Sequence, residues 1–148
     1  MILLDANLLL YACNEADDHH ADARAWLEGA LAGQEEVRLA WVTILAFLRI
    51  GTNPRAFEQP LSIQEAVGHV SAWLAQPVVG IIEPAERHWS ILSGLLPSAQ
   101  AKANLVMDAH LAAMAIEYGA TLCTSDRDFT RFQGLRLRYP LDAGKTPP

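Results

Sequence analysis

The chain has 148 residues, 51% of them hydrophobic and 19% charged, with a formal net charge of −6. This size and apolar content argue against intrinsic disorder and favour a single domain over residues 1–142, followed by a flexible tail at 143–148. The apolar runs are shorter than the roughly 18 residues of a membrane span, and the amino terminus lacks the basic segment of a signal peptide. We therefore expect a cytoplasmic protein without membrane contact.

The acidic residues are concentrated in residues 1–40, whereas opposite charges balance over the rest of the chain. Salt screens charges beyond about 8 Å, so local patches matter more than net charge. The charge permits a nucleic-acid partner without indicating one. The two cysteines, Cys13 and Cys123, lack the spacing of a redox or metal motif, and we expect both to be small buried hydrophobes.

The first half of the chain alternates short apolar runs with helical patterns. Residues 1–4 predict a buried strand, and a second apolar run at 8–12 follows Asp5-Ala6-Asn7. An amphipathic helix is predicted over 21–31, and residues 35–39 lead to a short strand or directly into a helix over 41–50. The residues of the first helix expected to face the core are Ala21, Ala25, Leu27 and Leu31. The Gly51-Thr52-Asn53-Pro54 turn ends the second helix.

The second half continues the alternation. Ser62 and Glu65 form a capping box for a helix over 63–74, and the β-branched run 78–82 predicts a doubly buried parallel strand. A helix over 85–96 is expected to stop at Pro97. Asp108 is predicted to cap a helix over 109–118 that Gly119 closes. The remaining predicted elements are a strand over 120–124, a turn over 125–128 and an edge strand within 134–141. This order predicts an α/β sandwich with a central, mainly parallel sheet flanked by helices.

Acidic residues follow the strands at one edge of this predicted sheet. The helix over 109–118 and the strand over 120–124 each span about 16 Å, so the strand returns to the level at which the helix begins. Asp108, Asp126 and Asp128 then share the carboxyl edge of the sheet. Asp5 joins them if the strand over residues 1–4 runs parallel to the strand over 120–124 and lies close to it. Such a cluster raises its own pKa values unless a cation neutralises it, and carboxylate oxygens suit Mg²⁺ or Mn²⁺.

Each acid also has a purely structural explanation. Asp108 alone is a helix cap, and Asp126 and Asp128 alone are turn residues. Asp5 is harder to explain in this way, because it follows a buried strand without an evident helix to cap. The four tryptophans at positions 26, 41, 73 and 89 are expected to anchor the core or an interface, and His110 is expected to be half-buried with its hydrogen bonds satisfied.

Several motifs together resemble those of the PIN-domain ribonucleases, and more narrowly the VapC toxins of bacterial toxin–antitoxin pairs. They are D-A-N near the start, R-I-G-T-N-P, N-L-V-x-D-A-H-L-A-A-x-A, T-S-D-R-D-F and the closing G-L-R-L-R-Y-P-L. The resemblance implies one PIN-like domain with Mg²⁺- or Mn²⁺-dependent endoribonuclease activity, a VapB-type antitoxin partner and a homodimer. The acidic first 40 residues and the apolar run 8–12 suggest an edge that faces the antitoxin.

The resemblance also implies roles for individual residues. Asp5, Asp108 and Asp126 match the acidic motif positions and are expected to bind the metal, with Asp128 close behind as a fourth catalytic acid. Asn7 and Ser125 match the accompanying polar positions, which orient carboxylates. We expect Arg49 and Arg127 to hold RNA phosphates, although Arg49 could instead pair with an acid near the sheet edge.

The chain departs from the family pattern in one helix. Many members carry a glutamate in the helix after the second strand, whereas no acid occurs here between Val37 and Glu58. Thr43, Thr52 or Asn53 could supply an oxygen instead, or Asp128 could replace the missing ligand. Binding of a second metal is therefore in doubt, and a one-metal mechanism or weaker activity becomes more plausible.

Three other functions are weighed against the nuclease. A receiver domain requires an acid that closes a middle strand, but Glu83-Pro84 follows the run 78–82 in a plain apolar context. A phosphatase of the DxD type requires a second acid two residues after Asp5, where this chain has Asn7. An inactive PIN-like domain that only binds RNA or an antitoxin remains the alternative, because the helix glutamate is absent.

Overall fold

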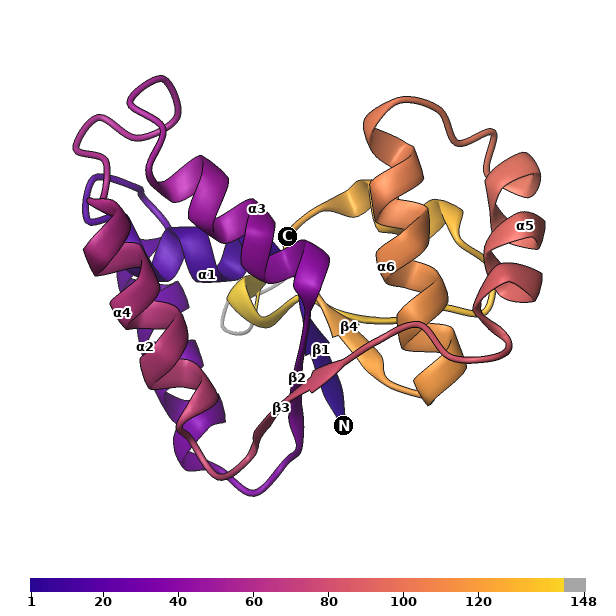
Figure 1. The fold of residues 1–148 in the computed structure, drawn as a ribbon, viewed down its shortest axis with the longest axis horizontal. Helices are drawn as coiled ribbons and strands as arrows, with labels where there is room; N and C mark the ends of the chain where they lie inside the picture. The colour runs from indigo at the N-terminus through magenta and orange to yellow at the C-terminus, as the bar shows by residue number, and fades with distance from the viewer. Residues whose placement is uncertain (143–148) are drawn as a thin grey trace.

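Five parallel strands form the centre of the molecule in the computed structural model, which describes residues 1–142 (Figure 1). The predicted tail at residues 143–148 lies outside the described residues. The strand order is β3-β2-β1-β4-β5, and every neighbouring pair is parallel. The strands are β1 (Ile2–Leu4), β2 (Val37–Ala40), β3 (Val79–Ile82), β4 (Thr121–Cys123) and β5 (Arg136–Arg138).

Helices cover both faces of the sheet, which confirms the predicted α/β architecture. The α-helices are α1 (Ala6–Cys13), α2 (His20–Ala32), α3 (Trp41–Gly51), α4 (Ile63–Leu74), α5 (His88–Ser98) and α6 (Asn104–Tyr118), and the 3₁₀ turns are η1 (Arg127–Arg131) and η2 (Pro140–Asp142). Figure 1 shows α1 to α4 on one side of the sheet and α5 and α6 on the other. Within residues 1–142, no helix combines the length and the apolar character needed to cross a membrane.

Alternation along β1 divides the core between the two faces. Ile2 and Leu4 belong to the hydrophobic cluster under α1 to α4, whereas Leu3 belongs to the cluster under α5 and α6. All three side chains are at most 2% exposed. Successive strand residues point to opposite faces, and a strand covered on both faces therefore reads as a continuous apolar run.

Local capping signals predicted several helix ends correctly. Ser62 and Glu65 form the expected capping box at the start of α4. Gly119 adopts a left-handed conformation with φ of 64° and ends α6, as the glycine stop predicted.

Two helix boundaries differ from the predictions. The apolar run at 8–12 belongs to α1, whose N-cap is Asp5, so Asp5 does have a local helix to cap. Its members Leu8 and Leu9 are at most 1% exposed, whereas Leu10 and Tyr11 are partly exposed, and the role of this run toward an antitoxin stays a prediction. The helix α5 begins at His88 and includes Pro97 in its last turn, because a proline there removes only one late backbone hydrogen bond.

Burial also corrects two expectations. The strand β3 lies at an edge of the sheet and is only partly covered, because no strand pairs with its outer side within the described chain. On α2 the core-facing residues are Ala23 and Leu27, whereas Ala21 and Ala25 are exposed. Of the tryptophans, Trp73 lies in the core, but Trp41 and Trp89 are 48% and 70% exposed.

Candidate active site

The carboxyl ends of β1 and β4 lie side by side and carry the first acids of the site. Leu4 and Cys123 are partners in the parallel register, and the backbone N–H of Asp5 donates to the carbonyl of Cys123 at 3.0 Å. Asp5 follows β1 directly, and Asp126 follows β4 after two residues. The sheet therefore brings together acids that are far apart in the sequence.

The hydroxyl of Thr124 connects the two strand ends. It donates to Oδ2 of Asp5 at 2.6 Å, and it accepts from the backbone N–H of Asp126 at 3.0 Å and from Nδ2 of Asn7 at 3.3 Å. Thr124 is fully buried, so water does not compete for these bonds. One side chain thus fixes the carboxylate of Asp5 and the backbone beside Asp126.

From the sequence, Ser125 was predicted to be the polar residue after β4 that orients the carboxylates, and Thr124 was missed. Ser125 is half-buried, and its hydroxyl makes no hydrogen bond within residues 1–142. The period-2 alternation of a strand places Thr124 on the same side as the buried Leu122, which was the available signal. The role of Asn7 beside Asp5 stays a prediction, but its amide does contact Thr124.

Asp108 contributes the third acid from the second turn of α6, not from a helix cap as predicted. The helix starts four residues earlier at Asn104, after Ala103, and this start lacks a side-chain cap. Burial, together with the negative charges of Asp5, Asp126 and Asp128, raises the pKa of Asp108 to about 6. These four carboxylates therefore share one electrostatic environment.

The other acids differ in how they are held. Burial raises the pKa of Asp5, whereas the hydrogen bonds from Thr124 and from the backbone of Ala6 lower it, and Asp126 raises it. Asp126 caps η1 by accepting from the backbone N–H of Asp128 at 2.8 Å. The side chain of Asp128 is exposed. Asp126 thus combines a capping role with its place in the cluster, whereas the side chain of Asp128 forms no capping bond within the described chain.

Within residues 1–142, no three His, Cys, Asp or Glu side chains converge into a set that holds a metal ion as they stand. The negative charges of Asp5, Asp126 and Asp128 raise the pKa of Asp108, and both Asp5 and Asp126 accept local hydrogen bonds. The donor chemistry nevertheless fits Mg²⁺ or Mn²⁺, because uncompensated carboxylates attract a hard cation. Oδ1 of Asn7 is also buried without a hydrogen-bond donor, which leaves a carbonyl oxygen available there.

The helix α3 contains no acid, and its polar side chains are used locally. Thr43 is buried and donates to the carbonyl of Leu4 at 3.1 Å, so its hydroxyl lies next to the backbone of Asp5. Thr52 donates to the carbonyl of Leu48, and Oδ1 of Asn53 accepts from the backbone of Arg55. Of the three predicted substitutes for the glutamate, only Thr43 is anchored to the end of β1.

The two predicted phosphate-binding arginines differ. Arg49 is exposed on α3 and has no side-chain partner in the described chain. Arg127 pairs with Asp142, and its guanidinium lies 3.7 Å from the centroid of the Tyr139 ring. Arg49 is therefore available to a ligand, whereas Arg127 is occupied within the protein.

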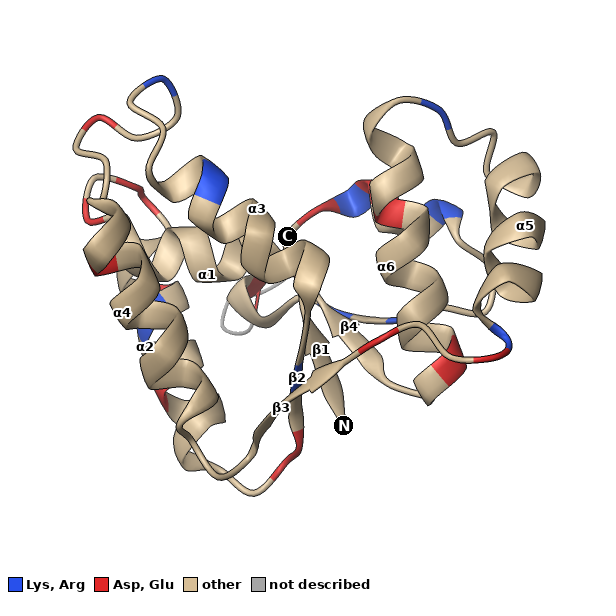
Figure 2. Cartoon of the chain, in the orientation of Figure 1, with Lys and Arg blue, Asp and Glu red and all other residues tan. Residues whose placement is uncertain are grey.

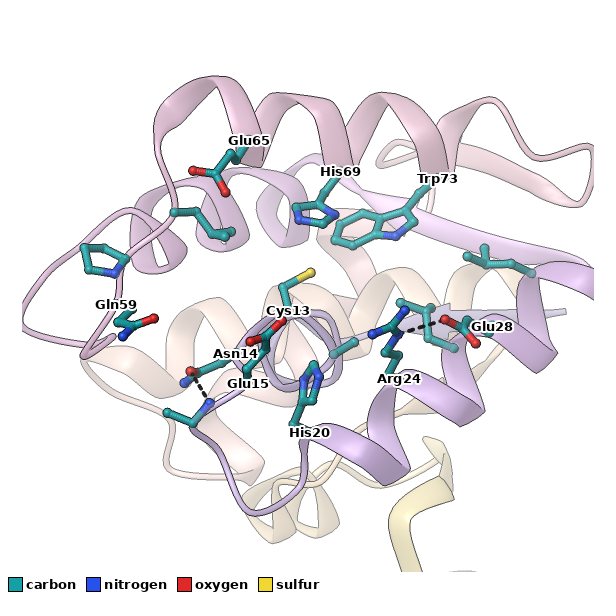
Figure 3. A pocket seen from close by; sticks show the side chains of 16 residues that line it. Cys13, Asn14, Glu15, His20, Arg24, Glu28, Gln59, Glu65, His69 and Trp73 are labelled. Atoms are coloured by element: carbon teal, nitrogen blue, oxygen red, sulfur yellow. Dashed lines mark hydrogen bonds and ion pairs between the residues drawn. The ribbon is translucent and has the colours of Figure 1, made fainter.

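Two further polar clusters lie outside the carboxylate site. His110 is half-buried as predicted, and its Nδ1 lies 2.9 Å from Nε2 of His88 on α5. A cavity of about 650 Å³ opens between α4 and the helices α1 and α2 (Figure 3). Figure 3 shows Glu65, His69 and Trp73 of α4 facing it from one side. None of the four clustered aspartates lines this cavity.

Comparisons with known proteins agree with this geometry. The PIN domain family model matches residues 2–135. Ribonuclease VapC37 of Mycobacterium tuberculosis is 44% identical over 140 residues, which cover 95% of this chain and 97% of that protein. VapC ribonuclease Mb2897 of Mycobacterium bovis is 41% identical over 142 residues, which cover 96% and 97%.

A solved structure supports the fold. The crystal structure of VapBC2 from Rickettsia felis bound to a promoter DNA fragment matches with a TM-score of 0.68 and 23% identity, over 93% of this chain and 98% of that one. At this identity the likeness concerns the fold alone, whereas the family model and the curated relatives cover nearly the whole sequence. The chain therefore belongs to the PIN-domain family, among the relatives named VapC.

Proposed function

We propose that this protein is a divalent-metal-dependent endoribonuclease and the toxin of a VapBC-type toxin–antitoxin pair. The observation that carries the proposal is the convergence of four aspartates where β1 and β4 end side by side, with Asp108 of α6 close enough for the other three charges to raise its pKa. A cluster of uncompensated carboxylates is costly to the fold, and it is the arrangement expected of a site that binds a cation. The relatives named ribonuclease point to RNA as the substrate.

Asp5, Asp108 and Asp126 would hold Mg²⁺ or Mn²⁺. When bound, such an ion supplies positive charge that stabilises negative charge on the phosphate during hydrolysis and lowers the pKa of the attacking water. Thr124 holds Asp5 in place, and Asn7 holds Thr124. Asp128, whose side chain is exposed, would accept a proton from water or orient it. We assign Ser125 a supporting role in the same turn.

The partners follow from the relatives and from the surface. The structural neighbour from Rickettsia felis is a VapBC assembly, and we propose a VapB-type antitoxin for this chain. We also propose a homodimer, as the family resemblance implies, and the side chain of Trp89, 70% exposed on α5, offers an anchor for such an interface. Sedimentation of the wild type and of Trp89→Glu tests the dimer. A wild type that stays monomeric at high concentration would rule it out.

Cleavage of RNA by the partner-free protein tests the enzymatic proposal. We expect discrete fragments with Mg²⁺ or Mn²⁺ and none with a chelator. Asp108→Asn and Asp126→Asn should each lower the rate by more than the roughly 10- to 100-fold typical of residues that only orient a ligand. Asp22→Asn, an exposed acid on α2, is the matched control and should keep full activity. Cleavage that persists in the chelator would contradict the proposal, and metal binding without cleavage of any RNA would favour an inactive binding domain.

A further inference from the structure

Most basic side chains of the described chain are already engaged within the protein. Arg24, Arg38, Arg127 and Arg138 pair with carboxylates, whereas Arg87 and Arg136 donate to backbone carbonyls. The bases whose side chains form neither an ion pair nor a hydrogen bond in residues 1–142 are Arg49, Arg55, Lys102 and Arg131, here called the free bases. All of them are exposed.

The free bases lie on the segments that leave or approach the carboxyl edge of the sheet. Arg49 belongs to α3, which starts directly after β2, and Arg55 follows in the next turn. Lys102 precedes α6, and Arg131 ends η1, the turn that Asp126 caps. Figure 2 shows basic segments on α3, on the loop after it and on the loop before α6. The free bases therefore flank the carboxylates from both helical layers.

Helix geometry gives the separation along the chain between three of these bases and residues at the carboxyl edge of the sheet. Arg49 is six residues beyond Thr43, whose hydroxyl contacts the end of β1, which corresponds to about 9 Å along α3. Asp108 lies four residues into α6, about 6 Å from the helix start that Lys102 precedes. Arg131 is five residues beyond Asp126. These separations correspond to one or a few nucleotides of an extended strand.

A polyanion needs such charges in order to reach this site. The phosphates of RNA are repelled by the clustered carboxylates of Asp5, Asp108, Asp126 and Asp128 before a metal is bound and remain poorly held after it. Cations on both sides of the cluster offset this repulsion and steer the approach of RNA. Unpaired surface arginines and lysines confined to these segments have this effect, whereas bases already paired with carboxylates do not.

We propose that three of the free bases bind the phosphates on either side of the one that is cut, with Arg49 on one side and Lys102 and Arg131 on the other. Arg127, which is held by Asp142 and Tyr139, does not contact RNA. This inference rests on the proposed ribonuclease function and names the residues that position its substrate. The contacts are to phosphates, so they set affinity and position without reading the bases.

The test measures how tightly a short, fluorescently labelled single-stranded RNA binds to the full-length protein at a series of salt concentrations. Binding is followed by fluorescence anisotropy in the presence of a chelator. Each lost phosphate contact should reduce the slope of log affinity against log salt by about 0.7. Arg49→Gln and Arg131→Gln should show this change and bind about threefold to tenfold more weakly at low salt. Arg49→Lys keeps the charge and should keep the slope. Arg24→Gln, which removes a base paired with Glu28, and Arg127→Gln should match the wild type.

Cleavage kinetics separate this inference from the proposal on which it rests. With Mg²⁺, Arg49→Gln should raise KM and leave kcat close to that of the wild type. If the wild type cuts RNA but the substitutions change neither slope nor KM, the free bases do not bind RNA and the inference is wrong. If they weaken only the binding of a VapB-type partner, the surface serves that protein and the inference is equally wrong. A wild type that neither binds nor cuts RNA would overturn the proposed function itself.

Discussion

Asp108 is placed where its own charge opposes folding. Its pKa of about 6 lies above the ordinary value of 3.8, so the folded protein binds this proton more tightly than the unfolded chain does. The contribution of this group to stability is therefore greatest at low pH, and it is lost as the pH rises from about 4 through 6. At neutral pH the metal-free protein carries an unfavourable charge that a bound cation would neutralise.

The substitution Asp108→Asn should therefore stabilise the metal-free protein while it abolishes activity. We expect a gain of about 1 kcal/mol at pH 7.5, after allowance for solvent screening of a half-buried group, and little gain at pH 4. The measurement is thermal unfolding of both proteins in a chelator across this pH range, where a shift of a few degrees is expected. A variant less stable than the wild type at pH 7.5 would show that Asp108 is not strained by its neighbours.

Thr124 provides a second prediction at the same scale. Thr124→Val keeps the shape of the side chain but removes the hydroxyl that holds Asp5 and the backbone of Asp126. We expect kcat to fall about 10- to 100-fold and the free energy of unfolding to fall by about 1–3 kcal/mol, because buried polar groups lose their partner. Thr124→Ser retains the hydroxyl and should recover most of the rate. Equal rates for the Val and Ser variants would exclude a positioning role.

At the scale of elements, helix ends that depend on a few neighbouring residues could be predicted from the sequence. The capping box of Ser62 and Glu65 and the glycine that ends α6 are of this kind. The start of α6 was not readable, because Ala103 takes a φ of 53° that few alanines adopt and the helix lacks a side-chain cap. The acids of the site were identified by their place after strands, but Thr124 was missed because its partners are Asn7 and Asp5, more than 100 residues away.

The start of α5 depends on another helix, which sequence patterns could not show. Its N-cap, Arg87, makes no side-chain capping bond. Instead the buried carboxylate of Glu117 on α6 accepts from the backbone N–H groups of Ala85 and Arg87, at 2.9 and 2.8 Å. A negative group at this position satisfies free N–H groups and complements the helix dipole. The two helices on this face are thus joined by polar contacts as well as by apolar packing.

Replacing this cap should weaken the α5–α6 layer. Glu117→Gln loses the charge and one acceptor, and we expect it to lower the free energy of unfolding by about 2 kcal/mol. Glu86→Gln, an exposed acid of the same loop without a hydrogen bond in the described chain, should change it by less than about 0.5 kcal/mol. Urea titrations of both variants provide the comparison, and equal midpoints would refute the capping role.

At the scale of the whole molecule, the acids of the site come from only part of the sheet. Asp5 follows β1, Asp126 and Asp128 follow β4, and Asp108 lies on α6, whereas α3 on the other side contributes no carboxylate. The family resemblance implied Asp5, Asp108 and Asp126 as metal ligands with Asp128 close behind, and the usual helix glutamate is missing from this sequence. The negative charge is therefore concentrated on one side of β1, which limits how many cations can be held.

We therefore expect one tightly bound divalent ion per chain. Titration of the protein with Mn²⁺, followed by electron paramagnetic resonance of the free ion, should show a single strong site at pH 7.5. Affinity should fall as the pH drops through about 6, because protonation of Asp108 competes with the metal. Asp108→Asn should lose the strong site. Two equally tight ions per chain would show that oxygens of α3, such as that of Thr43, complete a second site.

The pairing of β1 with β4 has a consequence for how the protein is made. Thr124, which holds Asp5, leaves the ribosome 119 residues after it. At translation rates of about 5–20 residues per second, roughly 6 to 24 seconds separate the two. A nascent or prematurely terminated chain therefore lacks the assembled carboxylate cluster. Copies that end before Thr124 is made therefore lack the site of the proposed nuclease.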